Sequence, residues 1–352
     1  MKKTLLLSIA FLSVTLANAQ TILTEDASSL TVGNIGTDLT GTTAGQGGWL
    51  TTAPNNGNNT DFQVVNVGGV YGNAIQITGS NTNANTRRMF KNVSAAWASR
   101  DAGNDVAQVQ FDLFTGAATT SANSFRVILY NEDNTRALAG FSYVAETRAL
   151  SGLSFFDNSG SPGGVMGNYL FFLSFNGTQY SNVILAPNTW YTLGASFNKG
   201  TGEVVFKELS GALITSSPVN GAAGGSDVAS VNLVISAIST TGQANTTAGV
   251  AVIDNINFRA VAEDSPLLKI TTPVAAADFS TYPNPAENVV NISTVGQIKS
   301  VSIADMNGRI VKNQAVGVAD ETQINVSDLN TGVYFMTVQG EAGSVTKKIV
   351  KQ

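Results

Sequence analysis

Short runs in which apolar and polar residues alternate recur along this chain, and they constrain its fold more than any other feature. The run VAQVQFDLF at 106–114 is an example, because alternation places Val109, Phe111 and Leu113 on one face. Clusters of Gly, Asn, Ser and Thr separate the runs, and no long segment after residue 20 has helical periodicity. Roughly a dozen such runs predict an all-β chain, with a jelly-roll β-sandwich as its main domain.

The composition excludes several classes of chemistry. The 352 residues include no Cys and no His, which excludes disulfides, thiolate nucleophiles, His-based catalytic triads and zinc sites built from Cys or His. Hydrophobic residues make up 43%, enough to form a core. The net charge of −5 argues against nucleic acid as a partner.

The first 19 residues have the pattern of a secretory signal peptide. Lys2 and Lys3 precede an apolar run at 5–16, and small residues follow at 17–19, which predicts cleavage between Ala19 and Gln20. The alternative is a membrane anchor, but this run of roughly 13 residues is shorter than the ~20 that a spanning helix needs. We therefore expect export by the Sec machinery and no transmembrane span in the mature chain.

Composition also divides the chain. Residues 20–258 are expected to form the jelly roll, and residues 259–278, rich in small residues with Pro266 and Pro273, to form a linker. Residues 279–352 contain six or seven further strand-like runs, which predict a small Ig-like β-sandwich.

The C-terminal unit carries a set of ordered motifs. They are Tyr282-Pro283-Asn284-Pro285, the hairpin turn Asn307-Gly308, Gly332 with Tyr334, and Lys347-Lys348 close to the end. In this order and position they resemble the type A C-terminal sorting domain of the type IX (Por) secretion system. The resemblance implies a Gram-negative bacterium, passage through the type IX translocon, and a secreted or outer-membrane cell-surface location. It also implies removal of the domain by a sortase-like peptidase, at a cut that would fall within 259–278.

The main domain has a looser resemblance to concanavalin-A-like and laminin-G-like jelly rolls. It rests on the WYTLGASFN run that begins at Trp190, the TGEVVF run at 201–206, and the closing strand with Ile253-Asp254-Asn255-Ile256. These are strand and turn features, so they indicate a fold more than a function.

Asp254 interrupts an apolar strand and is a candidate metal ligand. A buried carboxylate needs a partner or a cation. In related sandwich modules a carboxylate on the last strand joins N-terminal carboxylates around a structural Ca²⁺, and Glu25 and Asp26 are the matching residues here. The alternative is that Asp254 faces solvent or bonds locally.

Trp97 is the candidate for an exposed, sugar-stacking ring, because it lies in the AAWASR run at 95–100, near Arg87, Arg88 and Arg100. The alternative, common for large aromatics, is burial in the core. No E-x-D-x-E run or other paired carboxylate motif of a glycosidase occurs, so we expect no catalysis. The sequence thus favours an exported, non-catalytic carbohydrate-binding or adhesive module. A structural surface protein without a ligand and a polysaccharide-active enzyme remain alternatives.

Overall fold

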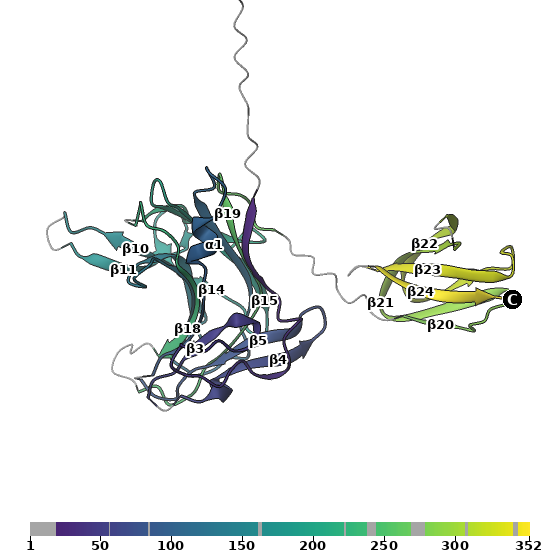
Figure 1. Ribbon diagram of the computed structural model, residues 1–352, viewed down its shortest axis with the longest axis horizontal. Helices are drawn as coiled ribbons and strands as arrows, with labels where there is room; N and C mark the ends of the chain where they lie inside the picture. The colour runs from purple at the N-terminus through teal and green to yellow at the C-terminus, as the bar shows by residue number, and fades with distance from the viewer. Residues whose placement is uncertain are drawn as a thin grey trace, which may run out of the picture. The chain divides into compact units, whose positions relative to one another are not determined.

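The computed structural model describes residues 19–55, 57–83, 85–160, 164–221, 223–237, 244–268, 279–306, 309–340 and 344–352. The predicted signal peptide, up to residue 18, lies outside these ranges. The chain forms two compact units, one containing Asn73–Leu268 with most of the preceding residues, and one containing Lys269–Gln352. Figure 1 shows that strands make up nearly all the regular structure of both. In the described part of the chain, no helix is long and apolar enough to span a membrane.

The larger unit contains two antiparallel sheets, which we name after central strands. The β7 sheet has the order β17-β16-β15-β7-β19-β5-β4-β2, with β1 also paired to β19. Its strands are β1 (Gln20–Glu25), β2 (Gly33–Asn34), β4 (Phe62–Gly68), β5 (Gly72–Thr78), β7 (Val106–Phe114), β15 (Trp190–Asn198), β16 (Glu203–Glu208), β17 (Val219–Asn220) and β19 (Val250–Val261).

The β8 sheet has the order β11-β10-β9-β8-β18-β6-β3, with β14 also paired to β10. Its strands are β3 (Leu50–Thr52), β6 (Arg87–Asn92), β8 (Asn123–Tyr130), β9 (Ala137–Val144), β10 (Ala149–Asp157), β11 (Met166–Phe171), β14 (Val183–Ile184) and β18 (Ser230–Ala237). The hairpin β12 (Ser174–Phe175) and β13 (Tyr180–Ser181) lies between β11 and β14 in sequence, and short helices are η1 (Gln46–Gly48), η2 (Asn59–Asp61) and α1 (Ser94–Ala98).

One hydrophobic core fills the space between the two sheets. Phe111 of β7 and Phe141 of β9 meet edge to face at 6.0 Å, and Phe141 also meets Phe206 of β16 at 5.4 Å. Val109, Phe111 and Leu113 are all buried in this core, as the alternation of β7 predicts. Two antiparallel sheets that pack face to face around one core form a β-sandwich of jelly-roll type, as expected from the sequence.

The outer face of the β7 sheet is covered by the chain that follows β19. Gln108 donates from Nε2 to the Ser265 carbonyl at 2.6 Å, and the Leu268 amide donates to Gln110 Oε1 at 2.7 Å. This differs from the linker expected at 259–278, because β19 continues through Val261 and residues 262–268 bond to β7. The rest of the expected linker, 269–278, lies outside the described residues.

The second unit is a small all-β fold with its own core. Its strands are β20 (Ser280–Tyr282), β21 (Val289–Ala304), β22 (Ile310–Asn325), β23 (Gly332–Gly340) and β24 (Ser344–Lys351). The described strands are fewer than the sequence predicts, because β21 and β22 are each 16 residues long and pair with each other across register shifts. A long strand of this kind can join both layers of a small sandwich.

Candidate functional site

The outer face of the β8 sheet carries an ordered array of polar and apolar side chains. In β8, the side chains of Phe125, Val127 and Leu129 enter the core, so those of Arg126, Ile128 and Tyr130 lie on the opposite face. The pairing places Val234 of β18 opposite Arg126 on one side and opposite Arg88 of β6 on the other. Arg88, Val234 and Arg126 therefore form one row across three strands.

The neighbouring rows on this face supply an apolar patch. Ile128, Ala137, Leu153 and Val234 form a buried cluster separate from the main core, and Tyr130 packs against it. Asn232 pairs across the sheet with Phe90 on one side and with Ile128 on the other. Its row therefore lies between the row that contains Arg88 and the row that contains Tyr130. The partly exposed groups of this face are therefore the phenol of Tyr130 and the guanidinium groups of Arg88 and Arg126, whereas the apolar cluster and Asn232 are buried.

Arg88 is held in place by its neighbours. Its Nε donates to Asn232 Oδ1 at 2.6 Å, one terminal amino group donates to Asn134 Oδ1 at 2.9 Å, and the guanidinium carbon lies 4.3 Å from the centroid of the Phe90 ring. Burial lowers the pKa of Arg88 from its usual value, since desolvation disfavours the charged form.

Arg126 has a different environment. Its Nε is buried without a hydrogen-bond partner in the described part of the chain. Burial lowers the pKa of Arg126 and raises the pKa of Tyr130, and the electrostatic interaction with Arg126 partly opposes the shift of Tyr130. Tyr130 and Arg126 are therefore close enough to interact electrostatically.

Exposed aromatic side chains lie at the edge of the same sheet. Strands β11 and β14 both pair with β10, and the hairpin between them carries Phe175 and Tyr180. These rings are 38% and 57% exposed, and their centroids are 4.5 Å apart. Exposed rings of this kind are one of the features by which proteins bind sugars or other proteins.

Trp97 does not form an exposed platform, which corrects the expectation from the sequence. Its ring is only 1% exposed, stacks on Phe258 at 5.9 Å, and lies beneath the Arg100 guanidinium at 4.1 Å. Its Nε1 donates to Asp227 Oδ1 at 2.8 Å. The polar neighbours that suggested exposure instead cover the ring, because α1 places Trp97 on its buried side.

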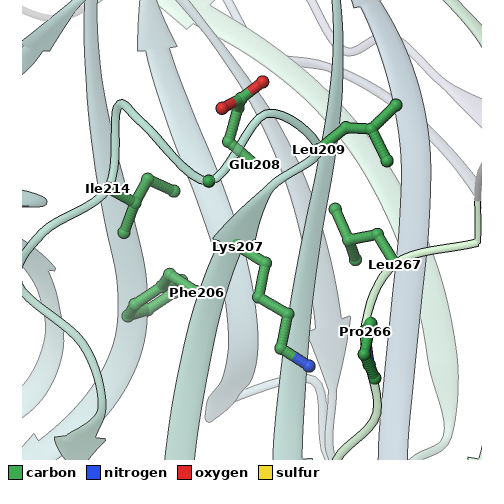
Figure 2. Close-up of a pocket in the computed structure, with 8 residues that line it drawn as sticks. Phe206, Lys207, Glu208, Leu209, Ile214, Pro266 and Leu267 are labelled. Atoms are coloured by element: carbon green, nitrogen blue, oxygen red, sulfur yellow. The ribbon is translucent and has the colours of Figure 1, made fainter.

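Pockets lined by described residues also lie elsewhere on the larger unit, and two of them contain charged groups. One, of about 400 Å³, is lined by Trp97, Arg100, Glu132, Lys199, Asp227 and others, and Lys199 lies 2.7 Å from Asp227. The second, of about 280 Å³, appears in Figure 2, where Lys207 extends between Phe206 and Pro266. Lys207 is bonded to Asp264 and to the Ser265 carbonyl. Neither lining includes Arg88, Arg126 or Tyr130.

Of the predicted calcium ligands, Glu25 is already paired and Asp26 is exposed. One oxygen of Glu25 accepts from Trp49 Nε1 and Lys91 Nζ, both at 3.0 Å, and the other accepts from the Ala27 amide. Asp26 accepts from the Ser28 amide and hydroxyl. Within the described ranges, no group of three or more His, Cys, Asp or Glu side chains has an arrangement that could hold a metal ion.

Asp254 nonetheless lies in an electrostatically unfavourable place. It is 2% exposed, it pairs across the sheet with Asp112, and its Oδ1 has no hydrogen-bond partner among the described residues. Burial, together with the carboxylates of Asp112, Asp26 and Glu25, raises the pKa of Asp254 to about 8. A bulge follows, in which Asn255 has a φ of 52° and donates from Nδ2 to Asp112 Oδ2 at 2.7 Å. The Oδ1 atoms of Asn255 and Asn257 are also buried and unpaired.

In the second unit, Asn284 joins the first motif to the final strand. Its Oδ1 accepts from the Val350 amide at 2.8 Å and its Nδ2 donates to the Lys348 carbonyl at 3.1 Å. Next to it, the Ala286 amide donates to the Val350 carbonyl at 2.8 Å. Asn284 and Ala286 therefore hold β24 at the edge that β23 leaves unpaired.

The other motif residues have structural roles as well. Gly332 begins β23 opposite Lys351, and Tyr334 donates its hydroxyl to the Asn330 carbonyl at 2.9 Å while its ring packs in the core. Lys347 bonds to the Phe279 carbonyl and lies over the Phe279 ring, whereas Lys348 and Tyr282 are exposed. Pro283 and Pro285 flank Asn284, and Asn307 and Gly308 lie outside the described residues.

Comparison with known proteins identifies the C-terminal unit. Residues 280–352 match the family model of the secretion system C-terminal sorting domain. This confirms the predicted sorting domain, and it places the chain outside the cell or on its surface. No curated protein matches the sequence significantly.

Solved structures with similar folds include proteins of several functions. Cellulose induced protein Cip1 is 14% identical over 70% of this chain and all of that chain, with a TM-score of 0.43. A β-glucanase from Bacillus licheniformis is 8% identical over 62% and 94%, with a TM-score of 0.39. The CBM2 module of an evolved Dit protein from Lactobacillus casei phage J-1 is 10% identical over 71% and 99%, with a TM-score of 0.40. A matched sialidase is much longer, and this chain spans 18% of its length.

Proposed function

We propose that the larger unit is a non-catalytic glycan-binding module, which the sorting domain delivers to the cell exterior. The observation that carries this proposal is the outer face of the β8 sheet. There, the side chains of Arg88, Arg126 and Tyr130 are partly exposed, above a buried apolar cluster that contains Ile128, Leu153 and Val234. A sugar has apolar C–H faces that can pack on an aromatic ring and polar groups that can accept from guanidinium donors, so these side chains suit it.

A binding role fits this surface better than a hydrolytic one. A glycosidase needs two carboxyl groups that flank the bond to be cleaved. Asp112 and Asp254 are paired across β7 and β19, but they are 5% and 2% exposed and lie on the other sheet. A polymer cannot reach carboxyl groups that are buried to this degree.

The proposal includes a structural Ca²⁺ at Asp254. The unpaired oxygens of Asp254, Asn255 and Asn257 are hard ligands of the kind that calcium prefers. A cation there would relieve the repulsion between Asp254 and Asp112. Glu25 fits such a site poorly, since Lys91 already neutralises its carboxylate.

The sorting domain implies interaction with the type IX secretion machinery. We further propose that the Sec machinery carries the chain across the inner membrane after recognition of residues 1–19, and that a sortase-like peptidase removes the sorting domain. Both steps follow from the resemblance of the sequence to exported proteins of this type.

The proposal is tested by binding of the purified full chain to a panel of neutral and acidic polysaccharides, measured by affinity electrophoresis. We expect at least one polysaccharide class to retard the protein. Tyr130→Ala should weaken that retardation about tenfold, by loss of a contact on the face, whereas Tyr282→Ala in the sorting domain should leave it unchanged. Retardation by no polysaccharide, with calcium present, would show instead a structural surface protein.

A further inference from the structure

The two arginines on the outer face of the β8 sheet share one row and have no acidic partner among the described residues; Arg136, Arg148 and Arg259 of the larger unit also have none there. Among the described residues, neither Arg88 nor Arg126 makes an ion pair with a carboxylate. Five other basic side chains of this unit do: Arg87 with Asp61, Lys91 with Glu25, Arg100 with Asp105, Lys199 with Asp227, and Lys207 with Asp264. The chain carries 24 acidic residues against 19 basic ones, so a shortage of carboxylates does not explain the difference.

The positions of the two arginines make the lack of acidic partners unfavourable when no ligand is bound. They flank Val234 on neighbouring strands, about 10 Å apart as two strand spacings require. Both side chains are partly buried, so desolvation disfavours their charged forms and lowers the pKa of each. An anion that lies on this row would stabilise the charged forms and accept from the guanidinium donors at the same time.

The donors are also arranged for such a ligand. Arg88 is fixed by Asn232, Asn134 and the Phe90 ring, so its remaining N–H groups have a defined direction. The Nε of Arg126 is buried without an acceptor among the described residues, and a guanidinium offers a fork of donors that matches an oxyanion in two contacts. Pre-organised donors bind an anion with a smaller loss of conformational entropy.

The accessible groups near the two arginines suit a sugar rather than a simple ion. Tyr130 is partly exposed on the same face, and Phe175 and Tyr180, at the edge of the sheet, are 38% and 57% exposed. Aromatic rings pack on the apolar faces of a sugar ring, whereas a free ion gains nothing from them. A ligand that uses these groups together with the arginines carries both acidic groups and sugar rings.

We infer that the ligand of this face is an anionic polysaccharide whose carboxylate or sulfate groups bind Arg88 and Arg126. The inference rests on the proposed glycan-binding function and names its substrate class. The recognising chemistry is the same for a uronate carboxylate and a sulfate ester, so the test includes one polymer of each kind.

The experiment measures binding of the full chain to polygalacturonate, dextran sulfate and uncharged dextran by isothermal titration calorimetry. We expect one or both acidic polymers to bind more than tenfold more tightly than dextran, and the affinity to fall as sodium chloride is raised. Binding of polygalacturonate alone indicates recognition of carboxylate groups, and binding of dextran sulfate alone indicates recognition of sulfate groups. Inorganic sulfate is titrated alone, and equal binding by the free ion would overturn the assignment to a polysaccharide.

The variants Arg126→Gln and Arg88→Gln should each weaken binding of the acidic polymer at least tenfold. Arg309→Gln is the matched control, because it removes the same charge from a side chain that is 79% exposed in the other unit. Thermal melting of each variant establishes that it is folded, and Arg126→Lys, which keeps the charge but not the fork of donors, should bind with intermediate affinity.

The outcomes separate this inference from the proposed function. If neutral dextran binds as well as the acidic polymers and only Tyr130→Ala weakens it, glycan binding stands and the acidic ligand is wrong. Unchanged affinity of a folded Arg126→Gln variant also rejects the acidic ligand. If none of the three polymers binds, and the wider panel gives no retardation, both the inference and the proposed function fail.

Discussion

Single residues of the larger unit show how local bonding sets the charge state of a carboxylate. Asp38 accepts from the amides of Thr40, Thr42 and Thr43 at 2.7–2.9 Å, and these bonds hold its pKa well below the usual range. Asp254 has the opposite environment, with a buried unpaired oxygen and Asp112 opposite it. The first carboxylate is satisfied by protein donors, and the second lacks a counter-charge.

A cation that binds at Asp254 should raise the melting temperature of the wild-type chain. A ligand at about one hundred times its Kd stabilises the folded state by about 2.7 kcal/mol, which for a unit of this size corresponds to roughly 5–10 °C. We expect calcium to produce this shift against chelator, and Asp254→Asn to abolish it. Asp133→Asn, on an exposed turn, should respond as wild type does. A calcium response that survives in Asp254→Asn places the cation elsewhere.

The hydrogen bonds to Asp38 predict a pH-dependent contribution to stability. The folded-state pKa lies below the unfolded value of 3.8, so the ionised form stabilises the fold above about pH 4 and this contribution is lost as the pH falls. Asp38→Asn should therefore lower the melting temperature by a few degrees at pH 7, and the difference from wild type should narrow near pH 2. If the difference in melting temperature between Asp38→Asn and wild type is the same at pH 7 and pH 2, the charge of the Asp38 carboxylate does not contribute to stability.

At the scale of elements, the final strand of the sorting domain is held on two sides. Strand β24 pairs with β23 along its length, and Asn284 and Ala286 bond to its far edge at Lys348 and Val350. The prolines at 283 and 285 have no amide hydrogen, so this segment cannot form a full strand ladder. The Asn284 side chain supplies bonds that the backbone there cannot make.

Replacing Asn284 by Ala should loosen β24 without unfolding the domain. We expect the Val350 amide to exchange with deuterium at least tenfold faster, since it loses its acceptor, and the Gly332–Gly340 strand to change little. Asn313→Ala, at an exposed position of β22, is the control. If Val350 exchanges at the wild-type rate in Asn284→Ala, the side chain does not hold the strand.

At the scale of the whole molecule, the two units have separate cores and separate tasks. The larger unit buries one core between its sheets, and the second unit buries another with none of the same residues. The sorting domain occupies 280–352, so the surface that we propose to bind glycan belongs to the other unit. The route of export and the ligand of the exported module are thus determined by different parts of the chain.

A chain that ends after Leu268 should fail to reach the cell surface. Because the sorting domain carries the export signal, we expect the truncated protein to remain inside the cell envelope, where external protease does not cleave it. The full chain should be cleaved or released under the same conditions. Surface exposure of the truncated chain would show that export depends on another segment.

The strand pattern and the C-terminal motifs were predictable from the sequence because both are local. Alternation within 106–114 placed Val109, Phe111 and Leu113 in the core correctly, and the motifs from Tyr282 to Lys348 identified the sorting domain. The same alternation in β8 separates Arg126 and Tyr130 from the core residues, so the local sequence also contains the signal for this face. The larger unit extends beyond its predicted end at residue 258, because Gln108 and Gln110 bond to residues 262–268, which are far from them in sequence.

By itself, the sequence determined the all-β class, the absence of Cys and His chemistry, and the sorting domain, since each depends on composition or on short ordered patterns. Only the tertiary structure decided that Trp97 is buried, that Lys91 neutralises Glu25, and that Arg88 and Arg126 lie on one row across β18. These facts depend on the register between strands that are distant in sequence. Burial and charge pairing arise from that register, and no local pattern contains it.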